Sequence, residues 1–401
     1  MYKIGVIGYG YVGKTLPDRL SEYYDVVCYE KNSRKIASFK ETKKLFLTNK
    51  ADYLEECNVF IITVQTPIDD IGNPNLEFII ESTESVAKHI SRGDIVVYES
   101  TVYPGVTETI CGKIIEKNTG LELNKDFYLG YSPERISPGD KKHKITNIAK
   151  IVSASNSFAL EIIKEIYSKV TQELFIVNSI MEAEAAKLLE NLQRDVNIAL
   201  MNEYSTVMRK MGINIHNVID AANSKWNFNY YLPGFVGGHC IGIDTHYYIK
   251  AAQDVGIDPQ IAKTARLINE DAIQNISNLI IKYVDKFKNK RVCVLGITYK
   301  DNIDDLRNSA SLKVMNKLKN QGCEVLVFDP LVSESAVRDM NIDLCSFEDI
   351  NDISVLVCLV YHDVFDGFEF DGTIFENQDE AIVIDPNCKL IKLRNYNKFI
   401  I

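Results

Sequence analysis

The chain has 401 residues, of which 46% are hydrophobic and 25% charged, and its formal net charge is −10. This length predicts two or three domains, and the composition is ordinary for a globular protein. The acidic balance argues against a nucleic-acid-binding surface, which needs clustered positive charge. No apolar run approaches the ~18 residues that span a bilayer, and the first residues lack the layout of a signal peptide.

The nine cysteines are odd in number and scattered, and no C-x-x-C pair occurs. A disulfide framework or a zinc site is therefore not expected. We expect a cytoplasmic protein that binds no metal, no nucleic acid and no membrane.

The chain opens with a dinucleotide-binding pattern. An apolar strand at 3–7 leads into G-Y-G-Y-V-G, a G-x-G-x-x-G run that precedes a helix. In this pattern Gly8 makes a tight turn, Gly10 lets a pyrophosphate approach the backbone, and Gly13 lets the helix pack on the strand. The helix N-terminus attracts the diphosphate, and the intervening Tyr11 and Val12 are expected at the same site.

A second apolar strand, 25–29, ends at Glu30. The Glu30 carboxylate would accept hydrogen bonds from the ribose hydroxyls and repel a 2′-phosphate. The sequence therefore predicts NAD rather than NADP, although Lys31 and Arg34 follow closely.

The strand pattern continues with polar or Pro/Gly-rich segments at the strand ends. These strands are expected at 59–64, 95–98, 127–131 and 148–152, with a helix at 76–90. Open parallel sheets bind ligands at the carboxyl ends of their strands. Four residues there are site candidates by position, with a turn cap as the alternative for each: Thr66, Glu99, Thr101 and Glu134.

From 178 to 210 the sequence is rich in helix formers and lacks Gly and Pro. Lys187 and Asn191 lie one turn apart, and Arg194 or Asp195 extends the same face. An asparagine in the middle of a helix is not a favoured choice, so this face suggests a polar pocket. A solvated helix face is the alternative.

Two further helices are expected, at 215–222 and at 258–286. Asp258 suits the N-cap of the second helix and Pro259 its first position. This long helix could join two lobes and pack against a partner subunit.

Between these helices, residues 232–248 are rich in glycine and surround one cysteine, Cys240. So many glycines disfavour a helix and favour a loop whose backbone comes close to a ligand. Cys240 could be a nucleophile or a buried structural thiol. Asp244 lies four residues further on, and two histidines flank the cysteine: His239, without an assigned role, and His246, interpreted as structural.

The alternating pattern restarts at Arg291, and R-V-C-V-L-G crudely repeats K-I-G-V-I-G. Strands are expected at 291–295, 325–328, 354–360 and 381–384. The glycine fingerprint is missing from this smaller α/β lobe. Lys300 and Arg307 stand before the next helix instead, which suits an anionic ligand other than the dinucleotide.

Seven blocks, in order along the chain, resemble the UDP-sugar 6-dehydrogenases, which oxidise a UDP-hexose to a UDP-uronic acid with NAD. The blocks are G-Y-G-Y-V-G, Q-T-P, E-S-T-V-Y-P-G, S-P-E-R-I-S-P-G-D, A-K-L-L-E-N-L-Q-R-D-V-N-I-A-L-M-N-E, V-G-G-H-C-I-G-I-D and G-I-T-Y-K-D-N-I-D-D-L-R-N-S. Three of them look like the branch that acts on UDP-N-acetylhexosamines for bacterial surface polysaccharides. That branch commonly has Asp-Pro-Tyr-Tyr after the cysteine, whereas this chain has Asp244-Thr245-His246-Tyr247. The aspartate is kept, so the departure concerns the local shape of the loop.

The resemblance implies an α/β fold with two Rossmann-like doubly wound domains, joined by a helical dimerisation domain and a long connecting helix. Residues 1–177 would bind NAD, 178–288 would form the dimer and carry catalytic residues, and 289–401 would bind UDP. The expected assembly is a homodimer.

The resemblance also implies a four-electron oxidation of C6. Cys240 would add to the aldehyde as a thiohemiacetal, and water would later hydrolyse the resulting thioester. Lys187 and Asn191 would stabilise the oxyanion. Asp244, with a water held near Thr101, would act as general base.

The remaining roles are assigned in the same way. Glu134 would assist hydrolysis or orient the water, and it is expected at the substrate with Arg135, Lys187, Asn191 and Gly237. Lys300 and Arg307 would hold the far parts of the UDP-sugar. Thr66 and Thr101 are expected near NAD.

Two other functions remain open. An ordinary two-electron NAD dehydrogenase would need neither Cys240 nor the second lobe, and a nucleotide-sugar sensor would bind without turnover. Among substrates, UDP-N-acetylglucosamine and UDP-N-acetylgalactosamine are expected first, with UDP-N-acetylmannosamine and UDP-glucose as alternatives.

Overall fold

The computed structural model describes residues 2–36, 42–69, 71–140, 142–238, 240–370, 372–386, 389–390 and 398–400. The chain divides into two compact units: residues 1–190 with 246–258, and residues 191–245 with 259–401. The division falls inside two helices, α6 (Ile180–Lys210) and α8 (Ile241–Asp254). The partition into three domains stays a prediction.

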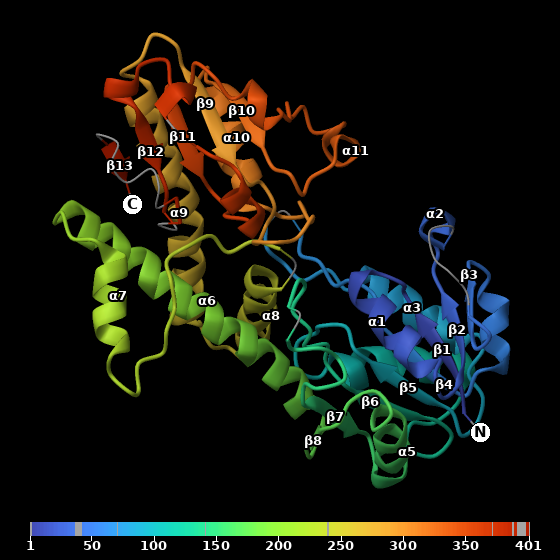
Figure 1. The fold of residues 1–401 in the computed structure, drawn as a ribbon. Helices are drawn as coiled ribbons and strands as arrows, with labels where there is room; N and C mark the ends of the chain where they lie inside the picture. Colours follow the sequence, from blue (N-terminus) through green and yellow to red (C-terminus); the bar gives the residue numbers. More distant parts are fainter. Residues whose placement is uncertain are drawn as a thin grey trace. The chain divides into compact units, whose positions relative to one another are not determined.

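The first unit is built on a sheet whose described strands number eight, in the order β3-β2-β1-β4-β5-β6-β7-β8 (Figure 1). Neighbouring strands are parallel except β6 and β7, which pair antiparallel. The strands are β1 (Lys3–Ile7), β2 (Asp25–Tyr29), β3 (Leu45–Thr48), β4 (Val59–Ile62), β5 (Ile95–Tyr98), β6 (Tyr128–Tyr131), β7 (Lys150–Ala154) and β8 (Leu174–Ile176).

Helices cover both faces of this sheet because strand side chains alternate between the faces. Ile4 and Val6 of β1 pack in one core with α1 (Tyr11–Leu20) and α5 (Ser157–Tyr167). Ile7 packs in the other core, with α3 (Glu77–Ala87) and α4 (Lys113–Thr119). The shorter helical segments of this unit are α2 (Ser33–Ile36), η1 (Ala51–Glu56) and η2 (Val106–Gly112). The predicted doubly wound arrangement is confirmed.

The second unit holds a parallel sheet whose described strands number five, in the order β10-β9-β11-β12-β13. These are β9 (Arg291–Leu295), β10 (Glu324–Phe328), β11 (Val355–Cys358), β12 (Ile382–Ile384) and β13 (Lys398–Ile400). One face packs against α9 (Gln260–Val284) and α10 (Ala310–Asn320). The other face packs on an aromatic cluster around Phe328, Phe365 and Phe370 rather than on long helices. Shorter helical segments are α11 (Glu334–Val337), η3 (Phe347–Asp349), η4 (Asp363–Gly367), η5 (Gly372–Ile374) and η6 (Gln378–Glu380).

Each strand expected from the sequence is present, within two residues of its predicted bounds. Two further strands of the first sheet, β3 and β8, were not expected. Both lie at sheet edges and leave large side chains in solvent, since Phe46 is 39% exposed and Phe175 is 59% exposed. Their apolar runs, at 45–47 and 174–177, are only three and four residues long, so neither stands out as a strand in the sequence.

The helical region largely follows the prediction, with α6 at 180–210 and α7 at Ile215–Asn223. The start of α9 was predicted slightly too early. Its first residue is Gln260, and Pro259 holds the N-cap position.

The interpretation of residues 232–248 as one loop is wrong from residue 241 onward, where α8 begins. Gly242 therefore lies in the first turn of a helix. A Cβ at this position would lie 3.2 Å from Nη1 of Arg266, so the glycine makes room for that side chain and is not a loop residue. Glycine in a helix costs about 1 kcal/mol, and neighbouring packing offsets that cost here.

No helix among the described residues is long and apolar enough to cross a membrane. No group of three or more His, Cys, Asp or Glu side chains in the same part of the chain is arranged to hold a metal ion.

Candidate active site

The turn after β1 needs glycine at its first position. Gly8 has a φ of +97°, and a Cβ there would lie 3.0 Å from Cγ1 of Val64. The Thr63 hydroxyl donates a hydrogen bond to the Gly8 carbonyl at 2.7 Å. Thr63, which directly follows β4, thus holds the turn after β1 in place. The glycine pattern in the sequence did not indicate this residue.

Gly10 differs from Gly8, because a Cβ built on Gly10 would meet nothing within 4 Å. It is the N-cap residue of α1, so the space beside it faces the start of a helix. This is the space that a pyrophosphate needs in order to reach the backbone N–H groups. Tyr11, Val12 and Gly13 form the next turn of α1, and their side-chain surroundings lie outside the described part of the structure.

Glu30 stands at the carboxyl end of β2 and is held by two backbone groups. Its Oε2 accepts from the N–H of Tyr9 and its Oε1 from the N–H of Asn32, each at 3.0 Å. The carboxylate is thereby fixed beside the glycine turn, where the sequence predicted the ribose-binding acid.

A cavity of about 490 Å³ opens over this turn, within the first unit. Its lining includes the predicted Gly8, Gly10 and Glu30 and several residues without a sequence signal: Gln65, Phe78, Ser82, Ser85 and Lys88. Thr66 is not among the described lining residues. The glycine turn, the helix N-terminus and the acid together fit a dinucleotide.

The loops after β5 and β6 carry Thr101 and Glu134, both partly buried. Oε1 of Glu134 accepts from the N–H groups of Arg135 and Ile136 at 2.7 and 2.6 Å. Its Oε2 is buried without a hydrogen-bond partner. Such an orphaned carboxylate oxygen calls for a water or a ligand group.

Lys187 of α6 meets this loop, since its Nζ donates to the Glu134 carbonyl at 2.8 Å. The side chain is 8% exposed, so the alternative of a solvated face does not hold for Lys187. Two of the predicted catalytic residues are therefore brought together by the first unit.

Two other candidates in this unit are engaged elsewhere. Glu99 is 3% exposed and accepts hydrogen bonds from Lys150 and Tyr167, which makes it part of the interior. Arg135 donates to the Ala149 carbonyl at 2.6 Å and pairs with Glu190 at 2.7 Å. The predicted contact of Arg135 with substrate stays a prediction.

In the second unit, Cys240 is exposed and directly precedes α8. Its carbonyl accepts the N–H of Asp244 at 2.8 Å, which is the first hydrogen bond of that helix. A helix N-terminus stabilises nearby negative charge, such as that of a thiolate. The alternative of a buried structural thiol is thereby wrong for Cys240.

Asn191 and Asp244 face each other in the interior of this unit. Nδ2 of Asn191 donates to Oδ2 of Asp244 at 2.5 Å, and the two residues are 5% and 1% exposed. Of the two candidates that could extend this face of α6, Arg194 is exposed and Asp195 is completely buried. Asn191 thus lies in a buried polar pair and not on a solvated helix face.

The glycines before the cysteine pack against the segment that follows β9. A Cβ on Gly237 would lie 2.9 Å from the Asn308 carbonyl oxygen, and one on Gly238 would lie 2.7 Å from the Tyr299 ring. Gly238 also has a φ of +76°. The glycines therefore serve contacts within the chain; His239 lies outside the described residues.

Arg307 lies near this loop in the same unit. Its guanidinium is held by Asp305, with Nη2 2.6 Å from Oδ2. The hydrogen bonds that Arg307 donates to Asp305 raise the pKa of Arg307, and Cys240 contributes in the same direction through its charge. Arg307 is thus within electrostatic reach of the cysteine, and its contact with a UDP-sugar, like that of Lys300, stays a prediction.

His246 packs against Gly72, and its structural role stays a prediction. Its ring lies 2.7 Å from where a Cβ of Gly72 would be, and Gly72 has a φ of +87°. The next residue, Tyr247, donates to the Pro67 carbonyl at 3.2 Å. Both contacts lie within the first unit.

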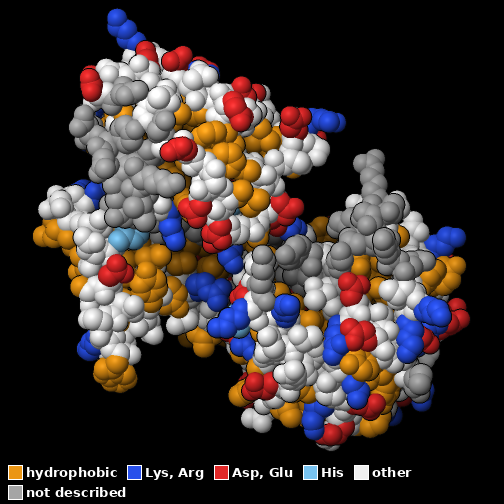
Figure 2. Space-filling model, viewed as in Figure 1, with side chains coloured by type: hydrophobic (Ala, Val, Ile, Leu, Met, Phe, Trp, Pro, Cys, Tyr) orange, Lys and Arg blue, Asp and Glu red, His pale blue; other side chains and the backbone are white. Residues whose placement is uncertain are grey.

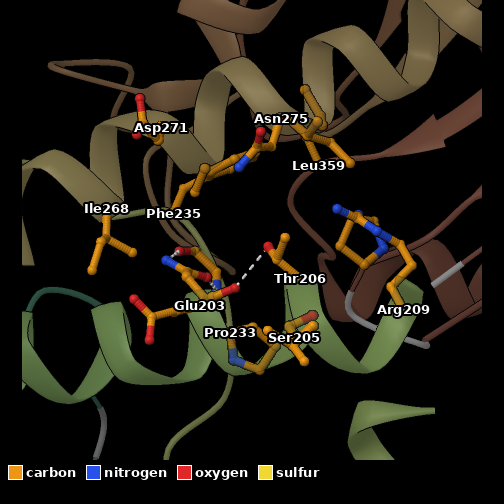
Figure 3. Close-up of a pocket in the computed structure, with 16 residues that line it drawn as sticks. Glu203, Ser205, Thr206, Arg209, Pro233, Phe235, Ile268, Asp271, Asn275 and Leu359 are labelled. Atoms are coloured by element: carbon orange, nitrogen blue, oxygen red, sulfur yellow. Dashed lines mark hydrogen bonds between the residues drawn. The ribbon is translucent and has the colours of Figure 1, made fainter. Parts of the chain in front are cut away.

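A second cavity, of about 270 Å³, lies within the second unit beside the segment that leads to Cys240. Figure 3 shows Thr206 of α6 and Asn275 of α9 on opposite sides of it, with Phe235 between the helices. Asn202 also lines the cavity and exchanges two hydrogen bonds with the Gly234 backbone, at 2.8 and 2.9 Å. No sequence signal pointed to this cavity.

Comparison with known proteins matches three regions of the chain to one family. Residues 38–171, 181–271 and 293–390 match, in turn, the NAD-binding, central and UDP-binding domains of the UDP-glucose/GDP-mannose dehydrogenase family. The chain is 41% identical over 356 residues to a UDP-N-acetyl-D-glucosamine 6-dehydrogenase of Salmonella typhi, covering 84% of each protein. It is 36% identical over 408 residues to Protein CapL of Staphylococcus aureus, covering 97% of this chain and 94% of that protein.

A solved structure agrees in fold. The UDP-D-ManNAc dehydrogenase of Pyrococcus horikoshii has a TM-score of 0.85 and 30% sequence identity, covering 96% of this chain and 94% of that one. The curated relative and the solved structure thus differ in the sugar that their names state.

Proposed function

Because the chain belongs to the UDP-glucose/GDP-mannose dehydrogenase family and is an NAD-dependent oxidoreductase with a nucleotide-sugar substrate, we propose that it oxidises C6 of a UDP-N-acetylhexosamine to the uronate. UDP-N-acetylglucosamine or UDP-N-acetylgalactosamine is the proposed substrate, and surface polysaccharide synthesis the proposed use of the product. The name of the relative that is 41% identical supports the glucosamine form. The observation that carries the chemistry is an exposed Cys240 at the N-terminus of α8 beside the buried Asn191–Asp244 pair.

The proposed chemistry passes through a covalent intermediate on Cys240. Bound NAD supplies the acceptor for each of the two hydrides that leave C6. The Cys240 thiolate adds to the aldehyde carbon, and oxidation of that thiohemiacetal leaves a thioester that water hydrolyses. Covalent capture prevents the aldehyde from escaping between the two oxidations.

Lys187 and Asn191 are suited to stabilise negative charge that develops on the substrate oxygen. A lysine ammonium has three N–H donors and an asparagine amide has two. Lys187 uses one donor on the Glu134 carbonyl and Asn191 uses one on Asp244, so each retains a donor for an oxyanion. Asp244 is proposed as the general base, with Thr101 holding a water and Glu134 orienting it for hydrolysis.

The test is a panel of UDP-sugars with NAD, in which NADH is counted per sugar consumed. Two NADH per UDP-N-acetylhexosamine are expected, with slower turnover of UDP-glucose. One NADH per sugar would favour an ordinary alcohol dehydrogenase, and binding without turnover would favour a sensor. A preference for UDP-N-acetylmannosamine would overturn the substrate assignment and leave the chemistry in place.

Cys240→Ala tests the nucleophile. Uronate formation should be lost while NAD binding remains. The matched control is Cys345→Ala, which removes a partly buried thiol that contacts the Val327 carbonyl in the second sheet. Full uronate production by Cys240→Ala would exclude covalent catalysis through this residue.

We also propose that the protein is a homodimer through α6. Leu200, Tyr204 and Val207 of α6 and Met211, directly after it, recur at helical spacing, and each is between 45% and 64% exposed. Hydrophobic side chains gather near α6 and α7 on the surface in Figure 2. Replacing Val207 and Met211 by lysine should convert a dimer into a monomer in analytical ultracentrifugation, and an unchanged mass would exclude this interface.

A further inference from the structure

The first turn of α8 is attached to α6 by two consecutive residues. The Asp244 carboxylate accepts a hydrogen bond from the Asn191 amide. The next residue, Thr245, donates a hydrogen bond from its hydroxyl to Oδ2 of Asp195 at 2.8 Å. Asn191 and Asp195 are one turn apart on α6. The two hydrogen bonds therefore connect the two helices at adjacent positions. The second one, between Thr245 and Asp195, involves residues that have no role in the proposed chemistry.

Asp195 is completely buried and its carboxylate is fully engaged. Oδ1 accepts from Arg266 Nη1 and from Asn269 Nδ2, each at 2.7 Å, while Oδ2 accepts from Thr245. A buried carboxylate is stable only when charge and hydrogen bonds compensate its desolvation. Arg266 of α9 provides the charge, so Asp195 joins α6, α8 and α9 at one point.

Arg266 also restricts the turn that carries the cysteine. A Cβ on Gly242 would lie 3.2 Å from Nη1 of Arg266, so the guanidinium packs directly against this turn. Gly242 lies two residues after Cys240, and Thr245 directly follows Asp244. The Asp195–Arg266 pair thus contacts α8 on both sides of the proposed base.

We propose that Asp195 and Thr245 are positioning residues, which hold the N-terminus of α8 so that Cys240 and Asp244 keep their geometry against Asn191. The inference rests on the proposed roles of Cys240 and Asp244. Thr245 occurs where the resembling branch commonly has proline, which has no hydroxyl to donate. The hydrogen bond from Thr245 to Asp195 is therefore a feature of this chain's own sequence.

Thr245 is the residue to change, because Asp195→Asn would remove the nearer anionic partner of the buried Arg266, leave Glu270 at 3.9 Å, and destabilise the fold. Thr245→Val removes the hydroxyl at nearly constant shape, and Thr245→Ser keeps it. Thr206→Val is the matched control, since the Thr206 hydroxyl donates to the Asn202 carbonyl at 3.0 Å within α6. Thermal melting of all three variants checks that they are folded.

Two readouts separate positioning from general stability. We expect Thr245→Val to lower kcat about tenfold or more while KM for NAD stays within twofold, with Thr245→Ser and Thr206→Val near wild type. The rate at which iodoacetamide alkylates Cys240, measured without substrates on the peptide that contains it, should fall at least threefold in Thr245→Val alone. Wild-type kcat and alkylation in Thr245→Val, or equal losses in Thr245→Ser or Thr206→Val, would overturn the proposal.

The alkylation readout does not depend on turnover, so two failures can be told apart. Full uronate production by Cys240→Ala would refute the proposed covalent role of Cys240, on which this inference rests, whatever Thr245 does. An inactive Cys240→Ala together with a fully active Thr245→Val would refute only the positioning role.

Discussion

Lys150 and Glu99 form an ion pair in the interior of the first unit, with 3.0 Å between Nζ and Oε2 and side chains that are 2% and 1% exposed. Tyr167 donates its hydroxyl to the other carboxylate oxygen at 2.5 Å, and Lys150 also donates to the Pro133 carbonyl at 3.3 Å. Glu99 precedes Thr101 by two residues, and Pro133 directly precedes Glu134. The pair therefore joins the two loops that carry these proposed site residues.

Removing only one member of the Lys150–Glu99 ion pair should strongly reduce the stability of the fold. Lys150→Met leaves the Glu99 carboxylate buried without its cation, and we expect the free energy of unfolding to fall by about 3–5 kcal/mol. Urea denaturation followed by circular dichroism measures this loss. The control is Lys164→Met, which removes an exposed pair with Glu161 and should cost less than about 1 kcal/mol. Equal losses in the two variants would contradict a special role of the buried pair.

Glu184 of α6 should make stability depend on pH. Burial raises its pKa from 4.5 to about 7, even though the N–H groups of Gly105 and Thr107 donate to the carboxylate. The folded chain then binds more protons than the unfolded chain between these two values, so stability falls as pH rises from 4.5 to about 7 and is level above. The loss amounts to roughly 3 kcal/mol at most.

Glu184→Gln should remove this decline, because the amide does not titrate. Urea denaturation at several pH values between 4.5 and 8 compares its slope with that of wild type. Glu203→Gln, at an exposed position on the same helix, should keep the wild-type slope. A decline that is unchanged in Glu184→Gln would assign the pH dependence to another group.

Glu30 should govern affinity for NAD. Glu30→Ala removes the acid expected to bind the ribose hydroxyls, and a hydrogen bond to a charged group contributes about 1.5–3 kcal/mol. We expect KM for NAD to rise about tenfold or more and the preference for NAD over NADP to shrink. Glu81→Ala is the control, since Glu81 lines the same cavity and forms an exposed pair with Lys31 at 3.2 Å. Similar KM values for Glu30→Ala and wild type would refute this role.

Gly238 and Gly234 allow a matched test of the cysteine loop. Gly238→Ala would place a Cβ 2.7 Å from the Tyr299 ring at a φ of +76°, whereas a Cβ on Gly234 meets nothing within 4 Å. We expect Gly238→Ala to lower kcat/KM for the UDP-sugar by at least tenfold and Gly234→Ala to change it little. Steady-state kinetics with each variant measures the difference, and equal effects would show that the close approach to Tyr299 is unimportant.

Most strands of the two sheets could be predicted from the sequence because buried parallel strands produce clear apolar runs. The glycine turn and Glu30 were found because the spacing itself carries the chemistry. Asp195 could not be separated from Arg194, since residues seven and eight positions after Lys187 both fall near the same helix face. Only the packing of α8 and α9 distinguishes the buried aspartate from the exposed arginine.

Other features had no sequence signal at all. The start of α8 was not predicted because several glycines in this segment disfavour a helix. Gly242 is needed there because the Arg266 side chain packs directly against it. Glu99 was a candidate by its place at a strand end, and nothing in the pattern indicated that Lys150 and Tyr167 would bury it. Such long-range partners are fixed by the tertiary fold and cannot be read from local periodicity.

The two hydrogen bonds between Asn202 and the Gly234 backbone limit how far the length of the segment before Cys240 can change. Gly238 is also fixed, because it exchanges hydrogen bonds with Asn308 at 3.3 and 3.4 Å, and α8 begins three residues later. The segment from Gly234 to Cys240 is thus fastened at both ends and tolerates no insertion or deletion without displacing the thiol. Upstream, the Trp226 side chain is 92% exposed, so we expect a change in chain length there to disturb the position of the cysteine less.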